Sequence, residues 1–99
     1  MAKKIIITRK AQANINEIIN GVIEYTGHAS SGIKLYKELY EKFELIGFLP
    51  KSGKLRNDGS DHRELFCRST YRIVYRELED SIQIITVVHA RKKYPILNK

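Results

Sequence analysis

The chain has 99 residues, of which 42% are hydrophobic, and its 18 basic and 11 acidic side chains give a formal net charge of +7. A chain of this length builds one hydrophobic core, so we expect a single domain over residues 1–99. The single cysteine, Cys67, excludes an internal disulfide and favours the cytoplasm, and no apolar stretch is long enough to cross a bilayer, so no membrane partner is expected.

The basic excess is concentrated in the second half of the chain. Residues 1–50 hold 7 basic and 5 acidic side chains, a net of +2, whereas residues 51–99 hold 11 and 6, a net of +5. Such a field attracts polyanions and acidic protein segments alike. The charge therefore indicates an anionic partner without identifying it, and a basic surface that serves solubility stays an alternative.

The N-terminal segment predicts a strand followed by a helix. Residues 3–8 (KKIIIT) are short and β-branched, which is typical of a strand buried on both faces. Apolar residues then recur every three or four positions from Ala11 to Ile23, as in an amphipathic helix. Thr8 is the expected cap at its start, and Gly27 marks its end.

A second apolar stripe predicts another helix. Ser30 or Ser31 is its expected N-cap, and Pro50 prevents its continuation. Tyr36 and Tyr40 belong to this stripe and are expected in the core rather than on a binding surface. Because the connection between the helices is short, they should form an antiparallel hairpin.

The second half predicts an exposed loop over residues 51–61, which is rich in glycine and charge, and then a sheet. Three β-branched and aromatic segments joined by short turns form an antiparallel meander: residues 64–68, 71–78 and 81–89. The last is apolar on both faces and should lie inside the sheet, between the N-terminal strand and the 71–78 strand. The fold class is α+β, in the order β-α-α-β-β-β, with the helices on one face.

Several motifs in this order resemble those of the RelE/ParE toxin superfamily of type II toxin–antitoxin systems. They are YRIVYR at 71–76, HARKKYP at 89–95, the Arg63-Glu64-Leu65 start of a strand, and the Pro50-x-x-Gly53 loop. The resemblance covers nearly the whole chain. It implies a growth-inhibiting toxin that forms a heterocomplex with an acidic antitoxin.

The long helix hairpin and the His-Ala-Arg-x-x-x-Pro ending look more like the ParE branch, whose members poison DNA gyrase. RelE-like members instead cut mRNA on the ribosome. Because a shared fold does not fix function, both targets stay open, as does an inactive module that binds an antitoxin and nothing else. A gyrase inhibitor needs no covalent chemistry, and neither branch calls for a cofactor or a metal.

Messenger RNA cleavage would need an acid, a base and cations around the reacting phosphate. The candidates are His89, Arg91, Tyr94 and Arg63. In RelE-like toxins the corresponding tyrosine comes later in the chain than Tyr94 does here. The structural alternative for His89 is a hydrogen-bonded residue at a strand end.

Further basic residues are candidates for contacts with nucleic acid or another target. They are Lys54, Arg56, Arg68, Arg72, Arg76, Lys92 and Lys93. Arg72 and Arg76 alternate along one face of a strand, a spacing that also fits salt bridges or a solvated edge. Cys67 is expected to be structural, because no Cys and His set has zinc-ligand spacing.

Overall fold

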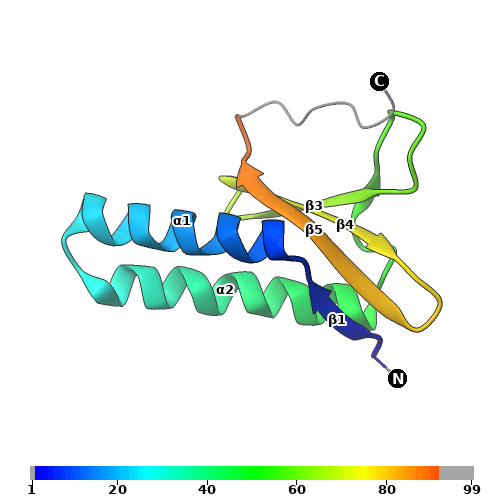
Figure 1. Cartoon of the computed structure of the whole chain (residues 1–99), viewed down its shortest axis with the longest axis horizontal. Coiled ribbons are helices and arrows are strands. Elements are labelled where there is room, and N and C mark those ends of the chain that lie inside the picture. The colour runs from blue at the N-terminus through cyan, green and yellow to red at the C-terminus, as the bar shows by residue number, and fades with distance from the viewer. Residues whose placement is uncertain (1, 92–99) are drawn as a thin grey trace.

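The computed structural model describes residues 2–91 and contains two helices and five strands (Figure 1). Their bounds are β1 Lys4–Ile7, α1 Arg9–Thr26, α2 Ala29–Phe48, β2 Lys54–Leu55, β3 Arg63–Cys67, β4 Tyr71–Glu77 and β5 Ser81–His89. The predicted α+β class and element order are confirmed. The strand count was too low by one, because β2 lies within the segment expected to be a loop.

The strands form one mixed sheet in the order β1-β5-β4-β3-β2. As predicted, β5 is interior, with β1 parallel to it on one side and β4 antiparallel on the other. The missed strand β2 is two residues long and pairs with β3 through Lys54–Glu64 and Leu55–Arg63. Two residues are too few to show an alternating pattern, so the sequence carries no signal for this strand.

Thr8 joins β1 to α1, and it caps the helix as predicted. Its hydroxyl accepts a hydrogen bond from the Ala11 amide and donates to the carbonyls of Ile84 and Ile85 in β5. At the other end of α1, Gly27 has a φ of 75°, the left-handed conformation that glycine adopts most readily. The helix ends are therefore fixed by the residues that the sequence indicated.

The start of α2 differs from the prediction. Its N-cap is His28, whose side chain makes no capping bond, and Ser30 and Ser31 lie in the first turn. The turn is tighter than expected because the Thr26 hydroxyl accepts from the His28 amide, while Gly27 reverses the chain. The helix can then begin directly after His28.

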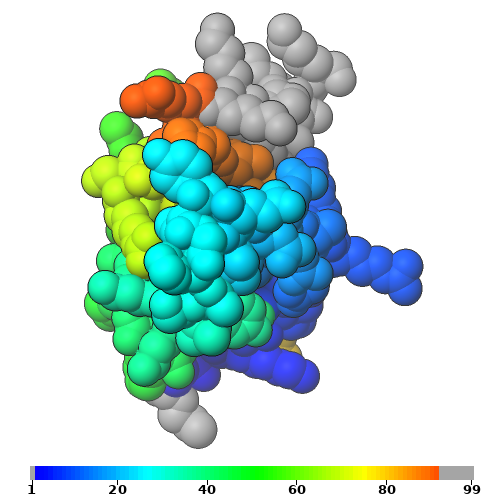
Figure 2. Space-filling view, turned by 90° about the vertical axis from the view of Figure 1, so that its left-hand side faces the viewer, coloured from blue at the N-terminus to red at the C-terminus, as the bar shows by residue number. Residues whose placement is uncertain are grey.

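The two helices pack on one face of the sheet and extend beyond it as a hairpin (Figures 1 and 2). The core lies between the helices and the sheet, and α2 contributes Leu35, Leu39, Phe43 and Ile46 to it. Tyr40 is half-buried against this core, whereas Tyr36 is 42% exposed, so its predicted place in the core was wrong. Tyr36 lies at the margin of the stripe, where the helix surface turns away from the sheet.

Tyr75 ties the segment after α2 to the centre of the sheet. Its buried hydroxyl donates to the Pro50 carbonyl at 2.7 Å and accepts from the Gly53 amide at 2.9 Å. Gly53 approaches so closely that a Cβ there would lie 2.6 Å from the Tyr75 hydroxyl and 2.7 Å from the Glu64 carbonyl oxygen. No larger residue fits this position without displacing the loop.

Two further findings concern residues singled out above. Cys67 is buried in the core, and burial raises the pKa of its thiol, as expected of a structural cysteine. Within residues 2–91, neither helix has the length and apolar character needed to cross a membrane.

We predict that Tyr75→Phe destabilises the domain by about 1–3 kcal/mol, because it leaves the Gly53 amide and the Pro50 carbonyl without their partner in a buried setting. Urea unfolding followed by circular dichroism measures this change. Tyr25→Phe, at a side chain that is 92% exposed, is the matched control and should change the free energy of unfolding little. Equal stability of the two variants would show that the Tyr75 hydroxyl has no such role.

Candidate target-binding surface

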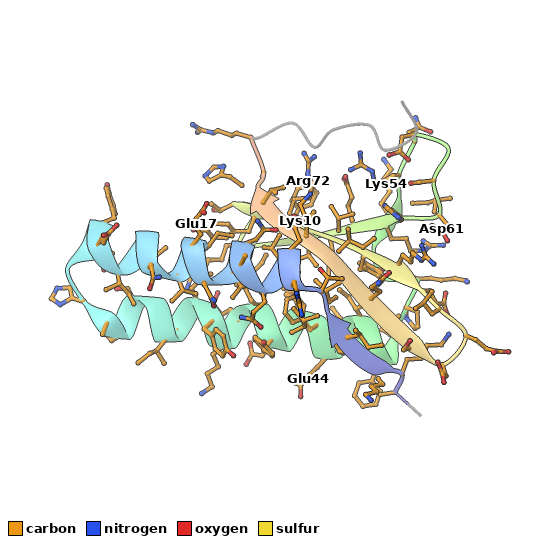
Figure 3. All side chains as sticks on the ribbon, in the orientation of Figure 1. Lys10, Glu17, Glu44, Lys54, Asp61 and Arg72 are labelled. Carbon is orange, nitrogen blue, oxygen red and sulfur yellow. The ribbon has the colours of Figure 1, made fainter. Side chains whose placement is uncertain are left out.

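The sheet has two chemically different faces, because side chains alternate along each strand. Ile73 and Tyr75 of β4 and Cys67 of β3 face the helices as part of the core. The residues between them therefore point to the other side. We call this side the arginine face and define it by Glu64, Phe66, Arg72 and Arg76. Figure 3 shows Arg72 and Lys54 on the side of the sheet away from the helices.

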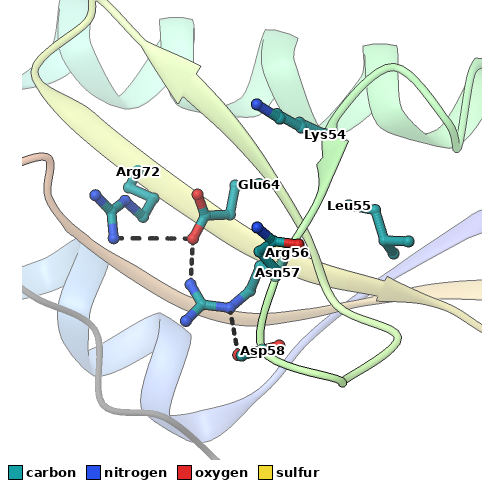
Figure 4. A pocket seen from close by; sticks show the side chains of 7 residues that line it. All are labelled: Lys54, Leu55, Arg56, Asn57, Asp58, Glu64 and Arg72. Carbon is teal, nitrogen blue, oxygen red and sulfur yellow. Dashed lines mark hydrogen bonds and ion pairs between the residues drawn. The ribbon is translucent and has the colours of Figure 1, made fainter.

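The turn between β2 and β3 supplies a cleft of about 470 Å³ at the edge of the arginine face (Figure 4). It is lined by Lys54, Leu55, Arg56, Asn57, Asp58, Glu64 and Arg72. Arg56 donates from Nε to Asp58 Oδ2 at 2.8 Å and from Nη1 to Glu64 Oε2. Arg72 Nη1 lies 3.8 Å from the same Glu64 oxygen. Two arginines thus share one carboxylate.

Asp58 gives the tip of this loop a defined shape. It accepts hydrogen bonds from the Ser60 amide at 3.0 Å and from the Ser60 hydroxyl at 2.6 Å. The Ser60 hydroxyl, followed by the Arg56 guanidinium, holds the pKa of the Asp58 carboxyl well below its usual range. Asp58 is therefore ionised at neutral pH. This loop tip is thus internally hydrogen-bonded.

Arg72 lies at the centre of the arginine face and retains unused donor capacity. Its Nη2 donates to the Ala90 carbonyl at 3.1 Å, and its guanidinium carbon lies 5.8 Å from the centre of the Phe66 ring. The Nε atoms of Arg72 and Arg76 are buried and have no hydrogen-bond partner. Arg76 makes no ion pair with any residue that the structure describes. The charge of Arg76 is therefore not neutralised within the described residues and can attract an incoming anion, whereas the buried Nε atoms are not accessible to one.

Two predicted site residues lie elsewhere and have internal partners. Arg68, at the β3–β4 turn, makes a two-pronged bond to Glu38 of α2 at 2.6 and 2.8 Å, which also lowers the pKa of Glu38. Arg63 lies opposite Tyr75, hence on the helix side of the sheet, and donates to the Gly53 carbonyl at 2.9 Å. Arg68 thus links the β3–β4 turn to α2, and Arg63 links β3 to the residue before β2.

His89 lies at the exposed end of β5, opposite Tyr71. Its ring meets the Tyr71 ring edge-on at 5.9 Å, and its Nδ1 accepts from the Arg91 amide at 3.3 Å. Because Tyr71 packs on the helix side, His89 does too. The strand partners of His89 and Arg63 are four positions apart in β4, roughly 13 Å along the strand.

Of the residues proposed for RNA cleavage, the described part of the chain separates Arg63 from His89, whereas Arg91 follows His89 closely. His89 and Arg63 lie at opposite ends of the sheet, and neither is on the arginine face. Arg91 is exposed directly after β5. Lys92, Lys93 and Tyr94 lie outside the described residues. Over residues 2–91, no group of three His, Cys, Asp or Glu side chains is placed to hold a metal ion.

A groove runs between α1 and the end of β5. One part, about 330 Å³, is lined by Glu17, Ile18, Gly21, Val22, Tyr25, Tyr71 and His89. It continues along Asn14, Val87 and Val88. Here β5 lacks a strand neighbour on one side, because β1 ends opposite Ile84. Asn14 fills part of this edge by accepting from the Thr86 hydroxyl and the Val87 amide.

Sequence reasoning missed the carboxylates Asp58 and Glu64, the ring of Phe66 and this groove. One signal was available, since Glu64 and Phe66 alternate with Leu65 and Cys67 and must share the face opposite the core. The pairing of Arg56 with both carboxylates had no such signal, because it depends on how the 56–60 loop folds back.

Comparisons with known proteins place the chain in a family. A family model for the ParE toxin of the type II toxin–antitoxin system, parDE, matches residues 5–94. A structure from the chromosomal ParDE toxin–antitoxin system of P. aeruginosa is similar with a TM-score of 0.77 and 20% identity, over 91% of this chain and 98% of that one. A double mutant of the E. coli toxin RelE in the free state gives 0.66 and 21%, over 92% and 86%.

These two structures share the fold of this chain, but their sequence identities with it are too low to transfer a function. Among the curated proteins, no sequence matches this chain. The family model covers most of the chain, including the helix hairpin and all of β3 to β5. The chain therefore belongs to the ParE toxin family of type II toxin–antitoxin systems.

Proposed function

We propose that this toxin arrests bacterial growth by binding DNA gyrase, without covalent chemistry of its own. The observation that supports this is the separation of His89 from the arginine face. RNA cleavage needs an acid–base group within hydrogen-bond reach of the phosphate that the cations hold. The imidazole near Arg56 and Arg76 belongs to His62, whose side chain is buried and is therefore not presented to an incoming phosphate. The same cations suit a binder of an anionic surface. Gyrase acts in the cytoplasm, which agrees with the localisation expected above.

In this proposal the arginine face contacts the target. Arg72 and Arg76 contribute guanidinium charges, and Lys54 and Arg56 contribute positive charge at the cleft. Phe66 is exposed next to Arg72 and adds an apolar contact. The carboxylates of Asp58 and Glu64 hold Arg56 in place, so its guanidinium is already oriented before the target arrives. Lys92 and Lys93, which lie outside the described residues, are also expected to contact the target.

We propose that an acidic antitoxin binds along the groove between α1 and β5. The groove offers apolar side chains from both elements, including Ile18, Val22 and Val87. The Val87 amide is already bonded to Asn14, which favours a helix in the groove over an added strand. An antitoxin tail that is disordered when free needs such apolar burial to offset its ordering entropy.

Inducing the chain alone should stop growth and should affect translation only later. The purified chain should inhibit gyrase supercoiling. Arg76→Ala should weaken inhibition about tenfold, because each lost charged hydrogen bond costs about 1.5 kcal/mol or more. Arg9→Ala makes the same change at an exposed position of α1 and is the control. Supercoiling assays across a concentration series measure both.

His89→Ala distinguishes the two targets. Gyrase inhibition should stay within about twofold of wild type, since no proton transfer is involved. If ribosome-bound mRNA is cut instead, with gyrase untouched, and His89→Ala lowers cleavage by about 10²-fold, then the RelE-like activity replaces this proposal.

Antitoxin association should depend on salt. The excess of +5 in residues 51–99 steers an acidic partner, whereas the apolar groove sets its residence time. Raising the salt concentration should slow association severalfold and change dissociation little. Stopped-flow kinetics over a salt series measure both rates. An association rate that does not change with salt concentration would mean that the charge of residues 51–99 does not accelerate antitoxin binding.

A further inference from the structure

Helix α2 carries a second apolar stripe that faces away from the core. Ile33, Tyr36, Tyr40 and Phe48 recur at spacings of three, four and eight, which places them on one side of the helix. Ile33 is 66% exposed and Phe48 is 68% exposed. A shallow groove of about 630 Å³ runs along Ile33, Tyr36, Lys37, Tyr40, Glu41 and Glu44. We call this surface the outer face of α2.

The centre of this face is already rigid. The Tyr36 and Tyr40 rings lie 4.6 Å apart, and the Tyr40 ring meets Phe43 of the core edge-on at 5.0 Å. Burial, together with the neighbouring Tyr36 hydroxyl, raises the pKa of Tyr40 to about 12, so the Tyr40 ring presents a neutral phenol. A partner that packs on them does not have to order these side chains first, which lowers the entropic cost of association.

The charges of the outer face differ from those of the rest of the molecule. Lys37, Glu41 and Glu44 sum to −1 in a chain of net charge +7. None of the three is in an ion pair with another described residue. Glu44 points away from α1 and from the sheet (Figure 3). An acidic antitoxin tail or a nucleic acid would meet net repulsion here, so the face does not suit the anionic partners that the arginine face attracts.

We infer that the outer face of α2 binds a second copy of this chain. If two α2 helices pack antiparallel about a two-fold axis between Tyr40 and Glu41, positions whose numbers sum to 81 face each other. Lys37 then meets the partner subunit's Glu44, and Ile33 meets the partner subunit's Phe48. Because a two-fold interface is self-complementary, each contact occurs twice, and every apolar or charged group just named gains a partner.

The length of the helix allows these contacts to form together. Ile33 and Phe48 are 15 positions apart, which is about 22 Å along a helix axis. Helices that cross at about 20° stay in contact over such a distance. One helix face per copy is smaller than the roughly 800 Å² per partner of a stable complex. The dimer is therefore expected to be weak, dissociating at micromolar or higher concentration.

Sedimentation velocity of the purified full chain, from micromolar to submillimolar concentration, tests the dimer. We expect a monomer–dimer equilibrium. Lys37→Glu or Glu44→Lys alone should weaken it about 10- to 50-fold, because two attractive pairs become two repulsive ones. The double variant Lys37→Glu/Glu44→Lys restores opposite charges and should return to within about threefold of wild type. Glu24→Lys makes the Glu44→Lys charge change on α1 and should have no effect.

Circular dichroism establishes that each variant is folded, which is expected because none of the substituted side chains makes a hydrogen bond or ion pair with another described residue. A wild-type chain that stays monomeric throughout would overturn the inference, as would a dimer that ignores both single charge reversals or that the double variant fails to restore. Antitoxin affinity should be the same for all of these variants. If the single reversals instead change antitoxin binding and not self-association, the face belongs to the antitoxin.

Discussion

The position of the candidate site depends on the buried hydroxyl of Tyr75. It holds the segment after α2 through Pro50 and the start of β2 through Gly53, both within 3 Å. These bonds fix where the chain returns to the sheet edge, and hence where Arg56 reaches Glu64 and Arg72. The helix hairpin and the arginine face are thus joined by one side chain that belongs to the core, so the binding surface inherits the rigidity of the sheet.

Features governed by local sequence were predictable. Residues 81–89 are apolar on both faces, which predicts an interior strand. The structure places β5 inside the sheet, with Ile84 and Val87 buried. Thr8 caps α1 through its own hydroxyl, and Gly27 ends the helix through its own backbone conformation, so both roles could be predicted from the sequence. The start of α2 and the strand β2 could not. The first depends on a bond between Thr26 and His28, and the second depends on Tyr75, which lies 20 or more positions away.

The basic candidates show the same division. Their charge was evident, but their use depends on which face and which partner folding supplies. Arg68 is held by Glu38, thirty positions away in sequence, and Arg63 by a backbone carbonyl on the helix side. Arg72 and Arg76 share the other face, and their Nε atoms have no hydrogen-bond partner among the described residues. A count of basic residues therefore overstates the positive charge available for binding, because some basic side chains already have partners within the fold.

Asn14 has a consequence for behaviour in concentrated solution. The end of β5 is an unprotected sheet edge once β1 has stopped, and such edges recruit strands from other molecules into aggregates. Asn14 presents a single oxygen to the Thr86 hydroxyl and the Val87 amide, so a helix side chain takes the place of a neighbouring strand. This arrangement lowers the tendency of β5 to pair with strands of other molecules when no partner covers the groove.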